Sequence, residues 1–550
     1  MNKKQFSIIA ILVLLNPILG TAQKIESKID NLYQTNSDQP GFSIAVFKDN
    51  KIVLEKQYGS ANLDYNIPIT NETVFDIGSI AKQFTAAAIL LLENEGKLSI
   101  KEPAYKYIAN LPRYEKGDPT IEQLLNQTSG IPEVDPYFHL TDLSFNDLLT
   151  QSRVSNIIVN LKELNFKPGE YFEYTNSNYI LLANIIEKVS EKSFVEYLKE
   201  HIFSPLKMEK TIKKNSTNTI IKNRAIGYIK DEGAYYKMHL HSAIYNGDGQ
   251  IMTTSKDMFN WHQGIRNATI GTPELWKKMH TKAKLNDGTK IDYGLGVEFE
   301  TYNGYSAMGF DGMIMGGFVS KYLYFPELDI AFFTTQNTFE EDFEERFFQL
   351  VDLYITSKKQ DNTNQELENV IIELSKDRLK KYEGSYIFLG NEYEDIRTGI
   401  IKLKENILVL KTTDGDEIGK LEPLGSQKFL MGGNIIEFDI LANKKQYKFY
   451  ANANEKPWLF KEFESYEHTE LELKELEGIY LNKNLQVAKE VKFKDGKLLQ
   501  LHYGRGAYSV EIKTLSKDLF NIPNYPIQFK RNKNGEIISL KIMGLEFKKI

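Results

Sequence analysis

The segment from Ile80 to Leu92 constrains the fold more than any other part of the chain. Nearly all of its residues are apolar or small, which predicts a helix that is buried on all sides. Glu95 and Gly96 follow it and predict the C-terminal end of that helix. Lys82 therefore lies on a core helix, where its ammonium must find an anionic or hydroxyl partner or lose its proton.

Ser79 stands three residues before Lys82, at the start of this helix. One helical turn brings positions i and i+3 to the same face, so we expect the lysine amine within reach of the serine hydroxyl. The start of a helix also offers unsatisfied amides and the positive end of the macrodipole. A weak nucleophile, a neighbouring base and an anion-stabilising helix end are what covalent acyl transfer requires. The alternative is that Ser79 only caps the helix and that Lys82 extends to the surface.

A second polar segment, Tyr174-Thr-Asn176, stands in a loop before another stretch with helical periodicity. A tyrosine fixed in such a loop can present its phenol to a site, and a lysine beside it favours the phenolate form. The pair could pass a proton from the serine to a leaving group. The alternative is a packed tyrosine ring followed by an asparagine that serves only the turn.

Together these segments resemble the serine hydrolase family that includes class C β-lactamases, penicillin-binding DD-peptidases and related esterases. The resemblance covers roughly residues 30 to 345 and rests on landmarks in a fixed order. These landmarks are Pro40–Phe47, Phe75–Ala86, Thr120–Pro132, Tyr174–Asn176, Gly247–Asp257, Tyr293–Val297 and Phe325–Asp329.

The resemblance implies a β-lactamase/transpeptidase-like catalytic domain of the α/β (α+β) class, with an antiparallel sheet flanked by helices. It implies that Ser79 is acylated, that Lys82 and Tyr174 transfer the proton, and that Asn176 orients the substrate or Lys82. It also implies that no metal and no organic cofactor takes part.

The third motif of that family is usually Lys-Thr-Gly or His-x-Gly, and by resemblance it falls on Phe310–Gly312. The usual cation is then replaced by Phe310, whose ring cannot bind a substrate carboxylate as a cation does. Met313 would supply the second backbone amide of the oxyanion hole, beside the amide of Ser79. A second register, on Ala307–Gly309, also lacks the cation.

Other chemistries find little support in the sequence. The chain has no Cys, which excludes thiol nucleophiles, cysteine-ligated zinc and disulfides. The close pair His239 and His241 has no acidic companion at a metal-binding spacing. A Gly-x-Ser-x-Gly elbow and a Walker-type loop are both missing, and a net charge of -6 gives no reason to expect nucleic acid as a partner.

Residues 1–22 have the charged, apolar and small-residue regions of a signal peptide, with cleavage expected after Ala22. The alternative is an uncleaved anchor, although the apolar run is short for a membrane span. No Cys stands near the cleavage site to carry a lipid anchor. We therefore expect a mature protein in the periplasm or outside the cell, without stable membrane insertion.

The remaining chain divides into a hydrolase domain at 23–356, a polar linker at 357–370 and two β modules at 371–466 and 467–550. The modules open on similar sequences, Leu379–Ile387 and Leu473–Leu481, and each continues with short alternating segments. This pattern predicts an all-β C-terminal region, built as small barrels or one sandwich, and the family resemblance adds a lipocalin-like character.

The sequence thus predicts an exported serine hydrolase that acts through an acyl-enzyme on a small-molecule or peptide substrate. That substrate could be an ester, an amide, a β-lactam or a D-amino-acid peptide. A catalytically impaired protein that binds a peptidoglycan fragment or a protein partner is the alternative, because the third motif lacks its cation.

Overall fold

The computed structural model describes residues 25–141, 147–238, 243–358, 371–388, 398–412, 415–441, 444–450, 456–502, 508–522 and 525–550. The expected signal peptide, most of the expected linker and the His239/His241 pair lie outside these residues. The chain forms two compact units. Unit 1 comprises Met1–Ser99, Leu182–Ala283 and Asp292–Asn362, and unit 2 comprises Ile100–Leu181, Lys284–Ile291 and Thr363–Ile550.

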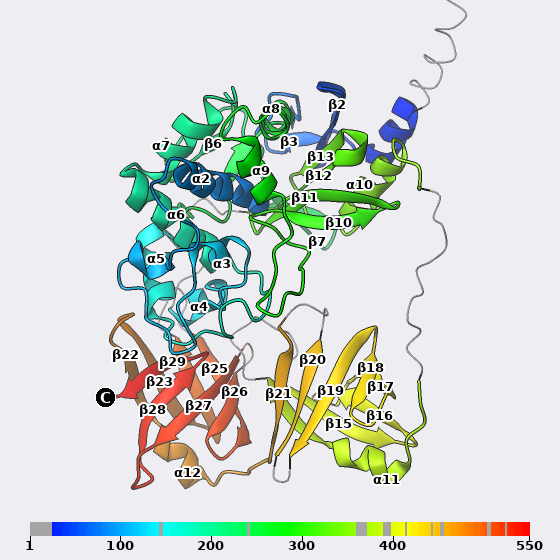
Figure 1. Cartoon of the computed structure of the whole chain (residues 1–550). Helices are drawn as coiled ribbons and strands as arrows, with labels where there is room; N and C mark the ends of the chain where they lie inside the picture. Colours follow the sequence, from blue (N-terminus) through cyan, green and yellow to red (C-terminus); the bar gives the residue numbers. More distant parts are fainter. Residues whose placement is uncertain are drawn as a thin grey trace, which may run out of the picture. The chain divides into compact units, whose positions relative to one another are not determined.

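Unit 1 is organised around a six-stranded sheet in the order β10-β11-β12-β13-β1-β2, whose neighbouring strands are all antiparallel (Figure 1). The sheet therefore joins the first strands of the chain to a later meander. Its strands are β1 Phe42–Lys48, β2 Lys51–Tyr58, β10 Glu298–Tyr302, β11 Tyr305–Ile314, β12 Phe318–Phe325 and β13 Ile330–Gln336.

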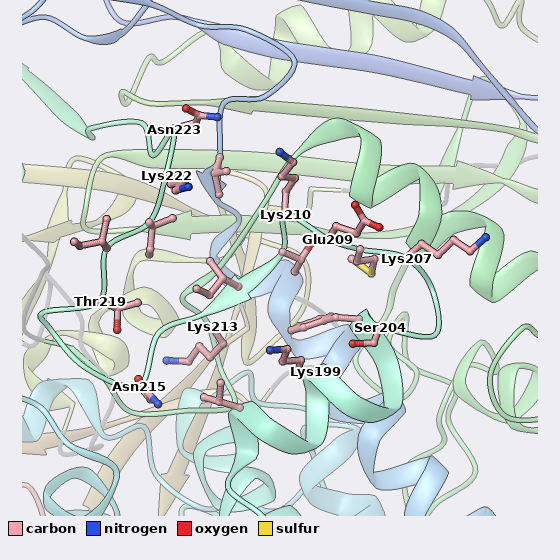
Figure 2. Close-up of a pocket in the computed structure, with 18 residues that line it drawn as sticks. Lys199, Ser204, Lys207, Glu209, Lys210, Lys213, Asn215, Thr219, Lys222 and Asn223 are labelled. Atoms are coloured by element: carbon pink, nitrogen blue, oxygen red, sulfur yellow. The ribbon is translucent and has the colours of Figure 1, made fainter.

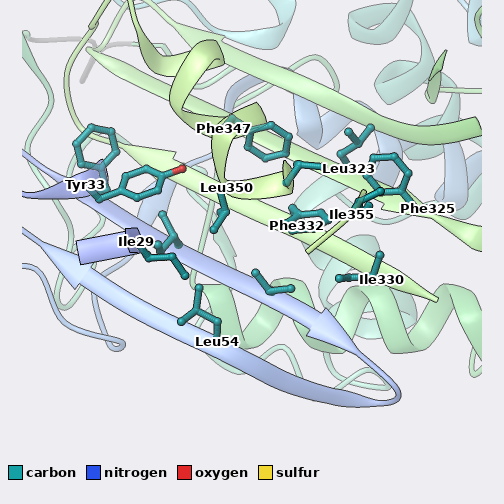
Figure 3. Close-up of a cluster of buried hydrophobic side chains, with 14 of the residues drawn as sticks. Ile29, Tyr33, Leu54, Leu323, Phe325, Ile330, Phe332, Phe347, Leu350 and Ile355 are labelled. Carbon is teal, nitrogen blue, oxygen red and sulfur yellow. The ribbon is translucent and has the colours of Figure 1, made fainter. Parts of the chain in front are cut away.

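One face of the sheet packs on helix 25–33 and on α10, Phe343–Asp352 (Figure 3). Ile29 and Tyr33 from the first helix and Phe347 from α10 meet Phe332 of β13 in a cluster of buried side chains. Side chains alternate between the two faces of a strand, so this cluster takes every second residue of the central strands. The antiparallel sheet flanked by helices matches the predicted fold class.

The second face packs on α8, Ser255–Arg266, whose His262 shares a hydrogen bond with Tyr322 of β12 at 2.8 Å, and α8 in turn contacts the predicted core helix. Helix α2 spans Lys82–Asn94, and its residues from Lys82 to Leu92 are all buried, as the sequence predicts. Glu95 is its C-cap, and Gly96 follows in the left-handed region with φ of +71°. Trp261 of α8 donates its indole N–H to Oε1 of Gln83 at 3.0 Å, which ties α8 to α2.

A three-stranded sheet, β5-β9-β6, leads the chain toward α2. Its strands are β5 Phe75–Asp76, β9 Ile251–Thr253 and β6 Ile212–Lys213. The remaining elements of unit 1 are β3 Ser60–Asn62, β4 Ile67–Pro68, α7 Phe194–Leu198, a π-helical turn Lys199–Phe203, β7 Tyr228–Asp231, β8 Ala234–Lys237 and α9 Pro273–Met279.

Unit 2 contains a helical part and two barrels. Its helices include α3 Ile121–Leu125, α4 Asp135–Leu140 and α5 Gln151–Asn160, and helix α6, Asn176–Ser190, begins within it. Thr120 and Gln123 form a complete capping box at the start of α3, and Thr150 caps α5. Among the described residues, no helix has the length and apolar composition that crossing a membrane requires.

Both β modules are closed eight-stranded barrels (Figure 1). Barrel 1 closes through pairing of its first strand, β14 Gly384–Phe388, with its last, β21 Trp458–Phe463. Barrel 2 closes in the same way through β22 Gly478–Asn482 and β29 Leu545–Lys549. The other strands are β15 Thr398–Lys404, β16 Ile407–Lys411, β17 Glu417–Pro423, β18 Lys428–Met431, β19 Asn434–Leu441, β20 Lys444–Tyr450, β23 Val487–Lys494, β24 Lys497–His502, β25 Tyr508–Ser516, β26 Leu519–Ile522, β27 Tyr525–Arg531 and β28 Ile537–Ile542.

The similar openings of the two modules fold in the same way. Tyr386 donates its hydroxyl to the carbonyl four residues earlier at 3.0 Å, and Tyr480 does the same at 2.7 Å. Both tyrosine side chains are fully buried. Short helices, α11 Lys376–Leu379 and α12 Glu470–Glu475, precede these strands. The C-terminal region is therefore all-β, as predicted, and it is built as two barrels instead of one sandwich.

Candidate active site

Ser79 lies in a tight turn between β5 and α2. The turn is a 3-10 helix, Gly78–Ala81, that runs directly into α2. Gly78 adopts φ of +52°, and its amide donates to the Asp76 carboxylate at 3.1 Å. The expectation that Ser79 itself opens the α-helix is corrected here, because the N-cap of α2 is Ala81 and neither helical segment has a side-chain cap.

Lys82 contacts Ser79 directly. Its ammonium nitrogen Nζ lies 3.0 Å from Ser79 Oγ and donates to the carbonyl oxygen of Asp248 at 2.9 Å. The lysine side chain is fully buried, which excludes the alternative of a lysine that extends to the surface. The i, i+3 spacing has therefore placed the amine at the hydroxyl, as the sequence predicts.

The segment that supplies the Asp248 carbonyl is the landmark Gly247–Asp257. Thr85 of α2 donates to the carbonyl of Gly247 at 2.7 Å, so two residues of the helix hold this segment. Burial raises the pKa of the Asp248 carboxyl, while the nearby charges of Lys82 and Lys213 oppose that rise. This segment is one of the family landmarks, and nothing in its sequence predicts the contact with Lys82.

The predicted third motif lies against the Ser79 turn. A Cβ atom on Gly312 of β11 would stand 1.9 Å from the carbonyl oxygen of Ile77 and 3.3 Å from the amide of Ser79. A Cβ on Gly78 would stand 2.8 Å from the amide nitrogen of Met313. The backbones of the two segments therefore approach so closely that only glycine fits. This contact supports the register that places the motif on residues 310–312.

Phe310 is buried, and its ring packs edge-on against Tyr293 at a centroid distance of 5.9 Å. The next residue, Asp311, pairs with Lys321 of β12 at 2.9 Å. Lys321 also lies over the ring of Phe348 in α10, on the opposite face of the sheet from Phe310. Lys321 therefore does not replace the cation that Phe310 displaces.

Tyr174 and Asn176 lie in unit 2. The Tyr174 side chain is 37% exposed, which excludes the alternative of a fully packed ring. The Asn176 amide donates to the Glu133 carboxylate at 2.6 Å, and its side-chain nitrogen donates to Asp135 at 3.3 Å. Neither acidic partner was predicted from the sequence, which carries no signal that joins them to Asn176.

The structure thus places the predicted residues in two groups. Ser79, Lys82, Gly312 and Met313 come together within unit 1. Tyr174 and Asn176 lie at the start of α6 within unit 2. Among the described residues, no three His, Asp or Glu side chains gather as a metal site would require.

A cavity of about 680 Å³ lies elsewhere in unit 1 (Figure 2). Neither Ser79 nor Lys82 lines it. Its wall includes Glu209 and the lysines Lys199, Lys207, Lys210, Lys213 and Lys222. Lys213 is buried there and donates to the carbonyl of Tyr245 at 2.8 Å, and burial lowers its pKa to about 8. The cavity is therefore separate from the candidate active site.

Comparison with known proteins shows the family of the chain. Residues 29–354 match the family model described as Beta-lactamase. The D-aminopeptidase of Brucella anthropi is 29% identical over 280 residues, which are 50% of this chain and 52% of that protein. Protein flp of Staphylococcus aureus is 35% identical over 277 residues, 49% of this chain and 53% of that protein. The chain therefore matches about half the length of these curated relatives.

A solved structure extends the comparison. The octameric penicillin-binding protein homologue from Pyrococcus abyssi is 26% identical, with a TM-score of 0.52. The similarity covers 80% of this chain and 100% of that one. Since the matched family model covers more than half of the chain and includes the contact between Ser79 and Lys82, the chain belongs to the beta-lactamase family.

Proposed function

We propose that this protein is a serine hydrolase that forms an acyl-enzyme on Ser79. The observation that carries the proposal is the 3.0 Å contact between Ser79 Oγ and the amine of the fully buried Lys82. A hydroxyl beside a buried amine is an arrangement that activates a serine nucleophile. Membership of the family supports the same chemistry.

The proposed cycle begins with the Lys82 side chain as a neutral amine. Ser79 Oγ attacks the substrate carbonyl while its proton passes to Lys82 Nζ. The amides of Ser79 and Met313 hold the resulting oxyanion, and the close contact between their segments supports this role. The proton then passes from Lys82 through Tyr174 to the leaving group as its bond to the acyl carbon breaks, and Asn176 orients the substrate or Lys82. Water then attacks the acyl carbon, its proton passes by the same route to Ser79 Oγ, and the bond from Ser79 to the acyl group breaks to release the acid.

We further propose neutral amides and esters of D-amino acids as the substrate class. The name of the D-aminopeptidase relative supports the choice of D-amino acids. The choice of a neutral substrate is supported by Phe310, because its ring cannot make a charge-assisted contact with a substrate carboxylate. The alternative of a catalytically impaired binding protein is less well supported, since the serine and lysine keep their contact.

The expected place of action is the periplasm or the exterior of the cell. This part of the proposal rests on the sequence of residues 1–22, which has the regions of a signal peptide.

Intact-mass analysis tests the proposed function. The full chain is incubated separately with a fluorophosphonate, a penicillin, a short-chain nitrophenyl ester and the nitroanilides of D- and L-alanine. A single phosphonate adduct on Ser79, with turnover of the ester and preference for the D-anilide, is expected. An adduct on another serine, or no turnover of any substrate, contradicts the proposal.

A further inference from the structure

The loop before Tyr174 is in contact with barrel 1. Lys456, which stands between β20 and β21, donates its backbone amide to the carbonyl of Phe172 at 3.3 Å. Its ammonium pairs with the Glu173 carboxylate at 3.4 Å. The side chains of Lys456 and Glu173 are only 16% and 14% exposed. A barrel residue therefore holds the residue immediately before Tyr174 through a backbone bond and a mostly buried ion pair.

Glu173 is also fixed from its other side. Its second carboxylate oxygen accepts a hydrogen bond from Asn165 at 2.8 Å, and its backbone amide donates to the carbonyl of Gln127 at 3.0 Å. With Lys456 on one oxygen and Asn165 on the other, the carboxylate has a defined orientation. The backbone that leads into Tyr174 is defined in the same way.

Barrel 2 contacts helix α4, which begins at one of the two acidic residues that hold Asn176. The hydroxyl of Tyr137, on α4, donates to the carbonyl of Met543 at 2.8 Å. Tyr137 is fully buried and Met543 is 5% exposed. Met543 lies in the turn between β28 and β29. Helix α4 begins at Asp135, whose carboxylate accepts the side-chain N–H of Asn176. The contact with barrel 2 therefore fixes the helix that orients Asn176.

A third contact between a barrel and the helical part differs in burial. Lys541 of barrel 2 pairs with Glu163 at 3.4 Å, but these side chains are 29% and 68% exposed. Exposed pairs of this kind contribute little to rigidity. The chain therefore offers two lysines for comparison, Lys456 in a mostly buried ion pair with Glu173 and Lys541 in a more exposed pair with Glu163.

We propose that the two barrels position the segment 172–176 for catalysis, with Lys456 and Tyr137 as its positioning residues. The proposal rests on the proposed function, in which Tyr174 transfers a proton. Removing the Lys456 ammonium leaves the mostly buried Glu173 carboxylate without this ionic partner, which favours a movement of the loop that hydrates the carboxylate more fully. A shift of about 1 Å in a proton-transfer group lowers kcat by up to about 100-fold.

The kinetic experiment compares Lys456→Met, Tyr137→Phe and the control Lys541→Met in the full chain. With a neutral nitrophenyl ester, Lys456→Met is expected to lower kcat by roughly 10- to 100-fold with little change in KM. Tyr137→Phe is expected to act in the same direction with a smaller effect, and Lys541→Met is expected to stay within twofold. A kcat of Lys456→Met within twofold of wild type overturns the proposal.

A mutant cycle with Tyr174→Phe tests whether Lys456 acts through Tyr174. If it does, the double variant is no slower than Tyr174→Phe alone. If the decreases in kcat caused by Lys456→Met and Tyr174→Phe multiply in the double variant, the proposal is overturned, because Lys456 then acts independently of Tyr174.

Hydrogen exchange of the peptides that cover 170–180 provides a readout that does not depend on the chemistry. Faster exchange is expected in Lys456→Met and unchanged exchange in Lys541→Met. Unchanged exchange in both variants overturns the positioning role, whether or not Tyr174 is catalytic. Full activity in Tyr174→Phe contradicts the proposed function instead, so the two failures can be told apart.

Discussion

The Ser79 turn and the Tyr174 segment are held in different ways. Ser79 is fixed by its near neighbours, since the Asp76 carboxylate binds the amide of Gly78 and the Lys82 amine reaches the serine from one turn away. The Tyr174 segment is fixed by residues far along the chain, including Lys456 in barrel 1. The comparison shows that the contact between Ser79 and Lys82 is a local product of the sequence, whereas the setting of the Tyr174 segment is a product of tertiary packing.

Ser79→Ala is the strongest test of the local group. It should abolish labelling by the fluorophosphonate and lower kcat by roughly 10³- to 10⁶-fold, because the nucleophile itself is removed. Steady-state kinetics and intact mass measure both effects. A variant that keeps a covalent adduct would show that the turn does not carry the nucleophile.

Lys82→Arg tests whether the buried amine acts as a base. A guanidinium stays protonated, so the variant should fold and yet lose about 10²- to 10⁴-fold in kcat. Lys97→Arg, just beyond the end of the same helix and 47% exposed, serves as the control. If Lys82→Arg were as active as the control, the lysine would only bind charge or fill space.

Tyr174→Phe tests the distant group directly. Loss of the hydroxyl should lower kcat by about 10²-fold or more, because the leaving group then lacks its proton donor. Tyr171→Phe, which changes a nearby tyrosine that packs on Phe166, should remain close to wild type. Equal kcat values for Tyr174→Phe and Tyr171→Phe would show that Tyr174 transfers no proton.

Phe310→Lys tests substrate choice on the strand that packs against the Ser79 turn. A charge-assisted contact contributes about 1.5 to 3 kcal/mol, so the ratio of kcat/KM for a penicillin over a neutral ester should rise by roughly one to two decades. Phe310→His should act in the same direction, and Phe310→Leu removes the ring without adding a charge. An unchanged ratio in all three variants would mean that position 310 does not face the substrate carboxylate.

The last test concerns stability and not rate, and it uses Asp76, whose carboxylate holds the Gly78 amide. Burial raises the pKa of this carboxyl to about 6, above the ordinary value of an aspartate. Because the folded state binds the proton more tightly than the unfolded state, this contribution to stability is complete below about pH 4. It is lost as the pH rises through about 6.

Urea unfolding of wild type and Asp76→Asn between pH 4 and 7 measures this effect. The free energy of unfolding of the wild type should fall relative to the variant by up to about 3 kcal/mol across that range. A constant difference would show that Asp76 stays ionised throughout, held by the neighbouring charges of Arg224, Lys213 and Lys214.

Sequence reasoning predicted the features that depend on local spacing. Helix α2 with its C-terminal glycine and the contact between Ser79 and Lys82 follow from positions that are close in the chain. The similar barrel openings were also visible, because the sequence repeats itself there. The predicted start of the helix was wrong, because a short 3-10 turn, Gly78–Ala81, precedes α2. Gly78 adopts a left-handed conformation at the start of this turn.

The sequence carried no signal for the contacts that join distant segments. The carbonyl of Asp248 meets Lys82 across 166 positions, and Lys456 meets Glu173 across 283. Every residue has a backbone carbonyl, so the residue type does not show which carbonyl binds Lys82. A lysine in a β module is expected to be a solvated side chain, so Lys456 was not predicted to form an ion pair with Glu173. Only the folded chain shows that these two residues lie beside the candidate catalytic groups.

The hydrogen bond between Tyr137 and Met543 also bears on when the protein can become active. Its partners are 406 positions apart, so during synthesis the tyrosine is made long before the carbonyl that it binds. At ribosomal rates of about 5 to 20 residues per second, roughly 20 to 80 seconds separate the two. The hydrogen bond that fixes helix α4 cannot form until Met543 has been made and barrel 2 has folded. The segment around Asn176 therefore cannot reach its native conformation before barrel 2 is assembled.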